Sequence, residues 1–131
     1  MTKILNISEA LTIAIHSMGL IGHSERPMNA KNIAEITGFS KNHISKVLQQ
    51  LAKNGYLISI RGPKGGYQIK DNPEDINLLE IYKLFEGDIK TDYCKHECEK
   101  CPFEKCVFDG ITQKLTSQFE EYLVNKKVSE L

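Results

Sequence analysis

The sequence has no long run of apolar residues, no tryptophan and only four prolines. Its first thirty residues carry polar and ionisable side chains among the apolar positions, so they predict neither a membrane span nor a signal peptide. We therefore expect a cytoplasmic protein that has no contact with a membrane. Since 40% of its 131 residues are hydrophobic, we expect one ordinary domain with a modest core, neither disordered nor fibrous.

Cysteine is absent outside positions 94–106. In a reducing compartment, four cysteines confined to so short a segment favour metal or redox ligands over structural disulfides. A bridged iron–sulfur cluster can take its ligands from one compact loop, whereas structural zinc more often uses two separated pairs. The residues favour a cluster, and they leave zinc or a thiol–disulfide switch as alternatives. The four candidate ligands have the spacing C-x3-C-x2-C-x4-C and are Cys94, Cys98, Cys101 and Cys106.

Acidic residues are scarce between Arg26 and Lys70, where Glu35 is the only one against eight Lys or Arg. From Asp71 onward, fourteen acids stand against eight bases, so the net charge of zero conceals a basic block followed by an acidic one. A basic block suits a segment that meets a polyanion, although charge asymmetry alone is common in folded domains. The pattern of residues inside the basic block therefore has to decide whether this segment binds nucleic acid.

The first predicted helix precedes the basic block. Asn6 followed by Glu9 fits an N-cap with a reciprocal acid three residues later, and the apolar residues that follow fall on one helical face. We expect this helix to run to about Met18 and to end at Gly19 and Gly22.

Two further helices are predicted inside the basic block. Asn29 caps a short one that Gly38 terminates, and Ser40 caps the next. Two short helices joined by a tight turn containing glycine are typical of a helix-turn-helix. The apolar face of the second is formed by Ile44, Val47, Leu48 and Leu51.

The opposite face of that helix has the chemistry of a DNA reader. An α-helix fits the major groove of B-DNA, where short polar side chains and Lys, Asn and Gln read base edges. Ser40 is expected to donate to a phosphate from the helix N-terminus. A merely solvated face is the alternative, but the helix-turn-helix spacing and the scarcity of acids favour DNA. The candidate residues are Ser40, Lys41, Asn42, His43, Ser45, Lys46 and Gln49.

Beyond Gly55 the hydrophobic period changes from helical to alternating. Residues 57–61 and 66–70 read as two strands joined by a turn rich in glycine, which together form a wing. Arg61 and Lys64 flank glycines that let the backbone approach closely, which suits contact with phosphates or the minor groove. The turn lacks the Gly-Lys-Ser/Thr ending of a nucleotide-binding loop and joins two strands, so that alternative is poor.

In the acidic half, Asn77 and Glu80 bracket the start of a short predicted helix that Gly87 ends, and a long helix is predicted from Val107 to about Lys126. About twenty helical residues span roughly 30 Å, and one small domain has little core left for such a helix to cover. A partner subunit is its natural neighbour, which predicts a homodimer. The apolar stripe expected at the interface is Ile111, Leu115, Phe119, Tyr122 and Leu123.

Three groups of residues carry a family resemblance: Ile33-Ala34 with Gly38 and Ser40; Leu48-x-x-Leu51-x-x-x-Gly55-Tyr56-Leu57; and Ser59-x-Arg61-Gly62-x-x-Gly65-Gly66-Tyr67. They closely resemble the Rrf2 family of bacterial winged-helix transcriptional regulators, over nearly the whole chain. The resemblance implies a homodimer held by the C-terminal helix, palindromic double-stranded DNA as partner and, in the sensor branch, an iron–sulfur cluster in the loop before that helix.

Cluster-binding members usually place three cysteines at wider spacing. Cys106 matches the last of these, while Cys94, Cys98 and Cys101 match the first two only as a group. The cluster type, [2Fe–2S] or [4Fe–4S], and the signal that it reports therefore stay open.

The sequence as a whole predicts a mainly α-helical protein with a small β-hairpin. We expect a winged helix-turn-helix domain over 1–90, a cysteine-rich cluster-binding loop over 91–106 and a dimerisation helix over 107–131. The expected function is transcription regulation, as repressor or activator, with the cluster sensing iron–sulfur, redox or nitric oxide status. A regulator with structural zinc or a thiol–disulfide switch is the alternative. No nucleophile–base pair, cofactor fingerprint or substrate motif is evident, so an enzyme is not expected.

Overall fold

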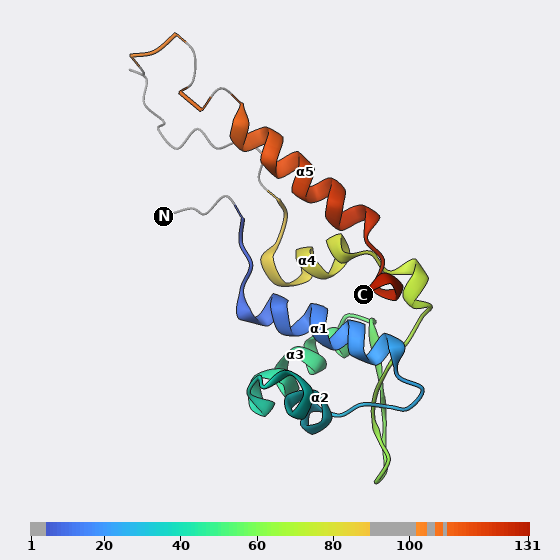
Figure 1. The fold of residues 1–131 in the computed structure, drawn as a ribbon. Coiled ribbons are helices and arrows are strands. Elements are labelled where there is room, and N and C mark those ends of the chain that lie inside the picture. Colours follow the sequence, from blue (N-terminus) through green and yellow to red (C-terminus); the bar gives the residue numbers. More distant parts are fainter. Residues whose placement is uncertain (1–4, 90–101, 105–106, 109) are drawn as a thin grey trace.

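The computed structural model describes residues 5–89, 102–104, 107–108 and 110–131 (Figure 1). This part of the chain is mainly helical and carries one antiparallel hairpin, which confirms the expected fold class. None of the described helices is long and apolar enough to cross a membrane. In chain order the elements are α1 (Glu9–His23), α2 (Ala30–Thr37), α3 (Lys41–Lys53), β1 (Leu57–Ile60), β2 (Gly66–Ile69), the 3-10 turn η1 (Pro73–Asp75), α4 (Leu78–Glu86), α5 (Ile111–Asn125) and the 3-10 turn η2 (Val128–Glu130).

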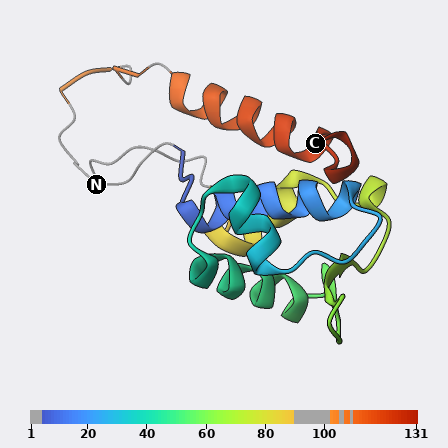
Figure 2. The same ribbon diagram turned by 60° about the horizontal axis from the view of Figure 1, so that its bottom comes forward.

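Helices α1 and α4 lie in the middle of the molecule, between α5 and the group formed by α2, α3 and the hairpin. Figure 2 shows the same arrangement as Figure 1, with α5 on one side of α1 and with α2, α3 and the hairpin on the other. The hairpin projects from the body on the side of α2 and α3. The basic half of the sequence and the last long helix therefore occupy opposite sides of the fold.

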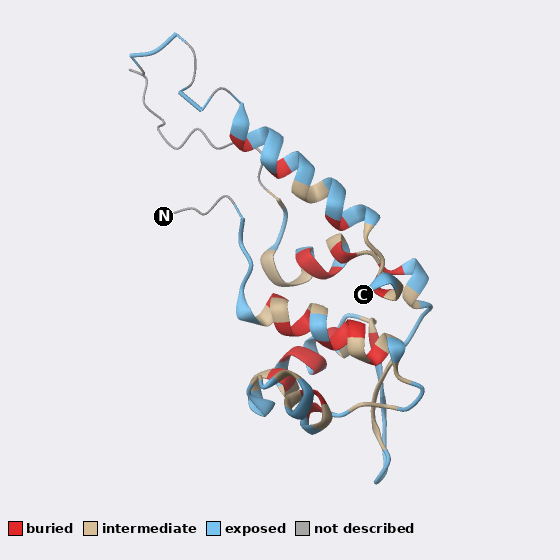
Figure 3. Cartoon of the chain, viewed as in Figure 1, coloured by how far each residue is buried: buried red, intermediate tan, exposed pale blue. Residues whose placement is uncertain are grey.

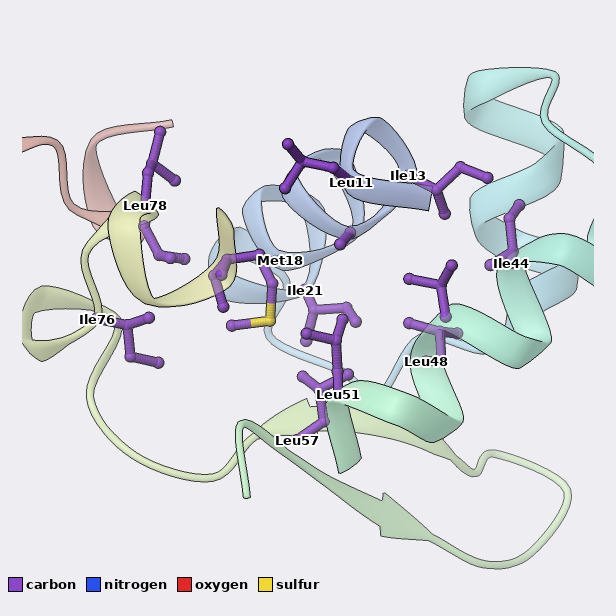
Figure 4. Close-up of a cluster of buried hydrophobic side chains, with 14 of the residues drawn as sticks. Leu11, Ile13, Met18, Ile21, Ile44, Leu48, Leu51, Leu57, Ile76 and Leu78 are labelled. Atoms are coloured by element: carbon purple, nitrogen blue, oxygen red, sulfur yellow. The ribbon is translucent and has the colours of Figure 1, made fainter. Parts of the chain in front are cut away.

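The hydrophobic core forms where α1, α3 and the base of the hairpin meet (Figure 4). Leu11 and Met18 of α1 belong to one buried cluster with Leu48 and Leu51 of α3 and with Leu57, the first residue of β1, and each is at most 2% exposed. Burying such a side chain is worth about 1.5–3 kcal/mol. The cluster therefore fixes the helix-turn-helix and the hairpin on α1, and Figure 3 shows the buried residues gathered on these inner faces.

The predicted bounds of the first helix are wrong at both ends. Ser8 is the N-cap in place of Asn6, because its hydroxyl oxygen accepts a hydrogen bond from the Leu11 amide at 3.1 Å. The helix also continues through Gly19 and Gly22, although a helical glycine costs about 1 kcal/mol relative to alanine. Both glycines serve close packing: a Cβ at Gly19 would lie 3.1 Å from Leu131, and one at Gly22 would lie 3.2 Å from Ile69.

The other caps are confirmed. Asn29 forms a capping box with Asn32, in which each side chain accepts a hydrogen bond from the other residue's amide. Ser40 caps α3, and Asn77 forms a second capping box with Glu80 at the start of α4. Short polar side chains satisfy amides that a helix leaves unpaired at its start, so these local signals are readable from sequence.

Helix α5 is shorter than predicted and its apolar residues do not share one face. It begins after Gly110, which has a φ of 75°, and it has 15 residues. Leu123 is buried in the core and Phe119 packs edge-on against Tyr82 of α4, with ring centroids 5.4 Å apart. The remaining three residues of the expected stripe, Ile111, Leu115 and Tyr122, are exposed. The stripe is thus divided between the chain's own core and the surface.

Candidate nucleic-acid interface

Helix α3 buries one face and exposes a polar one. At 100° per residue, Asn42, Lys46 and Gln49 lie opposite the buried face, and all three are exposed. Ser40 and Lys41 are also exposed, at the start of the helix. These five residues of the polar face predicted from the sequence are therefore exposed to solvent and can enter a groove. The buried face consists of Ile44, Val47, Leu48 and Leu51.

The structure places two of the candidate residues, His43 and Ser45, at the edge of this polar face. Both are half-buried, and Nδ1 of His43 lies 3.8 Å from Oε1 of Glu9 in α1. The imidazole is thus directed toward α1, beside the outermost line of α3. The Ser40 hydroxyl oxygen accepts a hydrogen bond from the His43 amide at 3.4 Å, so its own proton is free to be donated outward.

The wing carries both of its candidate cations on the surface. Arg61 and Lys64 are exposed in the connection between β1 and β2. The turn closes with a hydrogen bond of 2.9 Å from the Gly65 amide to the Gly62 carbonyl oxygen. A Cβ at Gly65 would overlap the Ile60 carbonyl oxygen, so only glycine fits there. Both cations lie in the tight turn between β1 and β2. Figure 1 shows this hairpin projecting from the body of the fold.

The wing is also attached directly to the helix-turn-helix. Met28, just before α2, pairs with Tyr67 of β2 through amide-to-carbonyl hydrogen bonds of 3.1 and 2.7 Å in the two directions. A Cβ at Gly66 would lie 2.5 Å from the Met28 carbonyl carbon. The Gly65-Gly66-Tyr67 part of the motif therefore has a structural role, because it fixes the position of the wing relative to α2.

Tyr56 fastens the base of the hairpin to α4. Its hydroxyl group donates a hydrogen bond to the Glu80 carboxylate, and its carbonyl oxygen accepts one from the Lys70 amide at 3.1 Å. Burial, the charge of Glu80 and this hydrogen bond together raise the pKa of Tyr56 above its usual value of 10.0. The phenol is therefore neutral at physiological pH and acts as a structural link.

The structure adds exposed cations and amides that sequence reasoning left out. Lys53 follows Asn42, Lys46 and Gln49 along the same line of α3, and Gln50 flanks that line. Lys31 is exposed in the first turn of α2, on the same side of the fold. All three lie within the basic block, so extending the helical periodicity by one more turn would have indicated Lys53.

The four cysteines lie outside the described residues. Among the residues that are described, no group of three or more His, Cys, Asp or Glu side chains is placed to hold a metal ion. At the end of α4, the Glu86 carboxylate accepts a hydrogen bond from the Ser8 amide at 2.9 Å, which ties α4 to the start of α1.

Known proteins match the chain in sequence and in fold. The Rrf2 family model, described as an iron-dependent transcriptional regulator, matches residues 7–131. The HTH-type transcriptional regulator NsrR of Bacillus licheniformis is 33% identical over 105 residues, covering 77% of this chain and 72% of NsrR. The structure of CymR, the global cysteine regulator of B. subtilis, is similar with a TM-score of 0.78 at 23% identity, covering 96% of this chain and 95% of that one. T. potens IscR gives a TM-score of 0.74 at 26% identity, with coverages of 96% and 85%.

The CymR likeness concerns the fold alone, whereas the family model matches residues 7–131 and so includes every described helix and strand. The polar face of α3, the anchored wing and the helix-turn-helix are what such a regulator requires. The chain belongs to the Rrf2 family of transcriptional regulators, a family of regulators and not of enzymes.

Proposed function

We propose that this regulator binds palindromic DNA as a homodimer, reading bases with α3 and contacting the backbone with the wing. The observation that carries the proposal is that the exposed polar face of α3 and the cationic wing tip project on one side of the fold, away from α5. Membership of a transcription-regulator family supplies the DNA partner. The residue roles below follow from side-chain chemistry.

Base reading falls to the outermost line of α3. Asn42 and Gln49 carry amides that can bond an adenine edge with two hydrogen bonds, and Lys46 can donate to guanine. Lys41 and Ser40 lie at the start of the helix, where backbone amides and the helix dipole favour a phosphate. Arg61 and Lys64 contact the DNA backbone or minor groove from the wing.

The exposed apolar surface of α5 supports the homodimer in this proposal. Ile111, Leu115 and Tyr122 are between 44% and 58% exposed on α5, and a monomer would leave this apolar surface in water. A two-fold dimer through α5 presents two copies of α3 on the opposite side. Two such helices about 34 Å apart fit successive major grooves, which is why a palindromic operator is expected.

Sensing is assigned to the cysteine segment. Four thiolates within thirteen positions are the soft donors that an iron–sulfur cluster requires, and the iron-dependent description of the family agrees with that donor set. When bound, the cluster supplies redox chemistry and reactivity toward small oxidants. Cys94, Cys98, Cys101 and Cys106 would hold it, with zinc or a disulfide as the alternatives.

The segment that carries these thiolates connects α4 to α5 in the sequence. It begins after α4, whose Glu86 is bonded to the cap of α1, and it ends before α5. Cluster gain or loss can regulate only if the cluster interacts differently with two states of the dimer. The hydrogen bond between the Ser8 amide and Glu86, eight residues before Cys94, is the contact through which we propose that such a difference reaches α1.

Three measurements test the proposal. A DNA fragment selected from a random library should bind with an affinity that falls steeply with salt, because several phosphates are neutralised. A flat salt response would contradict DNA binding through these cations.

Protein purified without oxygen should be brown and contain iron and acid-labile sulfide in near-equal amounts. Stoichiometric zinc without sulfide would contradict the cluster and indicate a structural zinc site instead. The Cys106→Ala variant should lose the chromophore.

A further inference from the structure

The elements assigned to DNA reading are fastened to one another. We call α2, α3 and the hairpin, within residues 28–69, the reading unit. The pairing of Met28 with Tyr67 joins the start of α2 to β2. The Tyr56 amide, just before β1, donates a hydrogen bond of 3.0 Å to the Leu51 carbonyl oxygen near the end of α3. A displacement of β2 therefore carries α3 with it.

The reading unit meets the segment that follows α5 at a glycine near the end of α1. A Cβ added at Gly22 would lie 3.2 Å from Cδ1 of Ile69, the last residue of β2, and 3.4 Å from Cγ1 of Val128, the first residue of η2. It would lie 3.8 Å from Cβ of Pro73 in η1. Side chains from three elements thus close over the bare backbone of this glycine. We call these four residues the Gly22 joint.

Val128 is held in this joint from the side of α4 and α5. It is fully buried, and its amide donates a hydrogen bond of 2.8 Å to the Ile76 carbonyl oxygen. The Leu78 amide, at the start of α4, donates one of 2.9 Å to the carbonyl oxygen of Lys126, the C-cap of α5. The Gly22 joint therefore has β2 on one side and the anchored end of α5 on the other.

Packing at this joint affects the angle between the reading unit and α5. Protein interiors are dense and transmit strain, so moving Ile69 away from Val128 displaces the reading unit as a whole. In a two-fold dimer the same displacement occurs in both copies, and the separation of the two α3 helices changes by twice the amount. One base pair corresponds to about 3.4 Å along DNA, so this separation decides which spacing of half-sites fits.

We propose that the Gly22 joint positions the reading unit relative to α5 and thereby sets the half-site spacing that the dimer accepts. This rests on the dimeric DNA binding of the proposed function and names the residues that determine its spacing. Gly22, Ile69 and Val128 are positioning residues, because they act on DNA only through the elements that they hold. The absence of a side chain at Gly22 permits the close approach of β2 to η2 that fixes one orientation.

The test uses the full chain, purified without oxygen, and a palindromic operator selected from a random library. Dissociation constants are measured on this operator and on two versions with one base pair inserted or deleted at the centre. In Gly22→Ala the added methyl pushes Ile69 and Val128 apart, so the preference for the original spacing over one altered spacing should fall about fivefold. Adding Ile69→Val removes Cδ1, the atom that the new methyl meets, and should restore the preference to within about twofold.

The matched control is Gly19→Ala in the same helix. It adds the same methyl group and gains the same helix propensity. The three atoms nearest to its new Cβ, the closest at 3.1 Å, all belong to Leu131 and none to the hairpin. The spacing preference should therefore stay as in the wild type.

Circular dichroism and urea unfolding check that each variant is folded. If Gly22→Ala does not fold, Val128→Ala loosens the same joint from its other side and should also lower the spacing preference. An unchanged preference in the folded variant, or an equal fall in Gly19→Ala, would overturn the role of the joint while leaving a dimeric DNA reader intact. A wild-type chain that binds a single half-site as tightly as the palindrome would instead refute the proposed dimeric reader.

Discussion

Helices α3 and α5 are both amphipathic and both expose one face, but the chemistry of those faces differs. On α3 the outward line is Asn42, Lys46 and Gln49, whereas on α5 it is largely apolar. Exposing polar side chains to water costs little free energy, and these side chains remain available for a hydrated, charged partner such as DNA. Apolar ones are costly in water and fit another apolar surface. The comparison teaches that the composition of the exposed face, and not amphipathicity itself, indicates the partner.

The largest expected effect comes from making the α5 face resemble that of α3. Leu115→Asp should abolish dimerisation and operator binding together. Leu115 is 44% exposed in the single chain, so burying two copies in the interface is worth about 1.5–3 kcal/mol in all, and the variant would also bury two carboxylates there. Sedimentation and operator titration on one sample measure both. Gln113→Asp, on the same helix but off the exposed line, should change neither. A variant that stays dimeric would show that the exposed face of α5 is not the dimer interface. A monomeric variant that binds the operator with full affinity would show that DNA binding by α3 does not depend on dimerisation.

The attachment of the wing can be weakened without touching either face. Gly66→Ala would bring a Cβ against the Met28 backbone at a φ of 152°, so we expect a loss of about 2 kcal/mol in unfolding free energy and weaker operator binding. Gly55→Ala also has a positive φ, of 86°, but meets nothing within 4 Å. It should cost about 1 kcal/mol, from backbone strain alone. Equal losses in urea unfolding would mean that the Met28–Tyr67 pairing is unimportant.

Base reading and backbone contact on the DNA-binding side should be separable. Gln49→Ala should cost about 1–3 kcal/mol on the selected operator and little on random DNA. Lys64→Ala should weaken binding to both by the same factor and lower the salt slope by about 1. Titrations on the two DNAs at several salt concentrations distinguish them. The assignment of the reading face would be wrong if both variants acted equally on specific and random DNA.

The smallest effect concerns the link that Tyr56 forms between the base of the hairpin and α4. Its pKa is raised in the folded state, so its contribution to stability is fully present below pH 10.0 and is lost as the pH rises through the folded-state pKa. Urea unfolding of the wild type should therefore show a fall in stability above about pH 10 that Tyr56→Phe lacks. At neutral pH the variant should lose about 1 kcal/mol, the worth of one hydrogen bond. An alkaline fall of equal size in the variant would assign it to other groups.

Local signals were readable from the sequence wherever a few neighbouring residues decide the structure. The caps at Asn29, Ser40 and Asn77 were predicted because each side chain bonds an amide only two or three residues away. The buried and polar faces of α3 followed from the 3.6-residue period, and the hairpin from its glycine-rich turn. These features indicated which side chains of α3 and of the wing are exposed, apart from the half-buried His43 and Ser45.

Only the tertiary structure decided where distant segments meet. Gly19 and Gly22 do not end α1, because the C-terminal residues and β2 pack closely against them. The expected stripe of α5 is divided because α4 takes Phe119 while Leu123 enters the core, and the sequence cannot say which of two adjacent helical lines a neighbour will cover. The pairing of Met28 with Tyr67 likewise joins residues far apart in the chain. Periodicity shows that a face must be covered, but which face meets which partner depends on the packing of the whole chain.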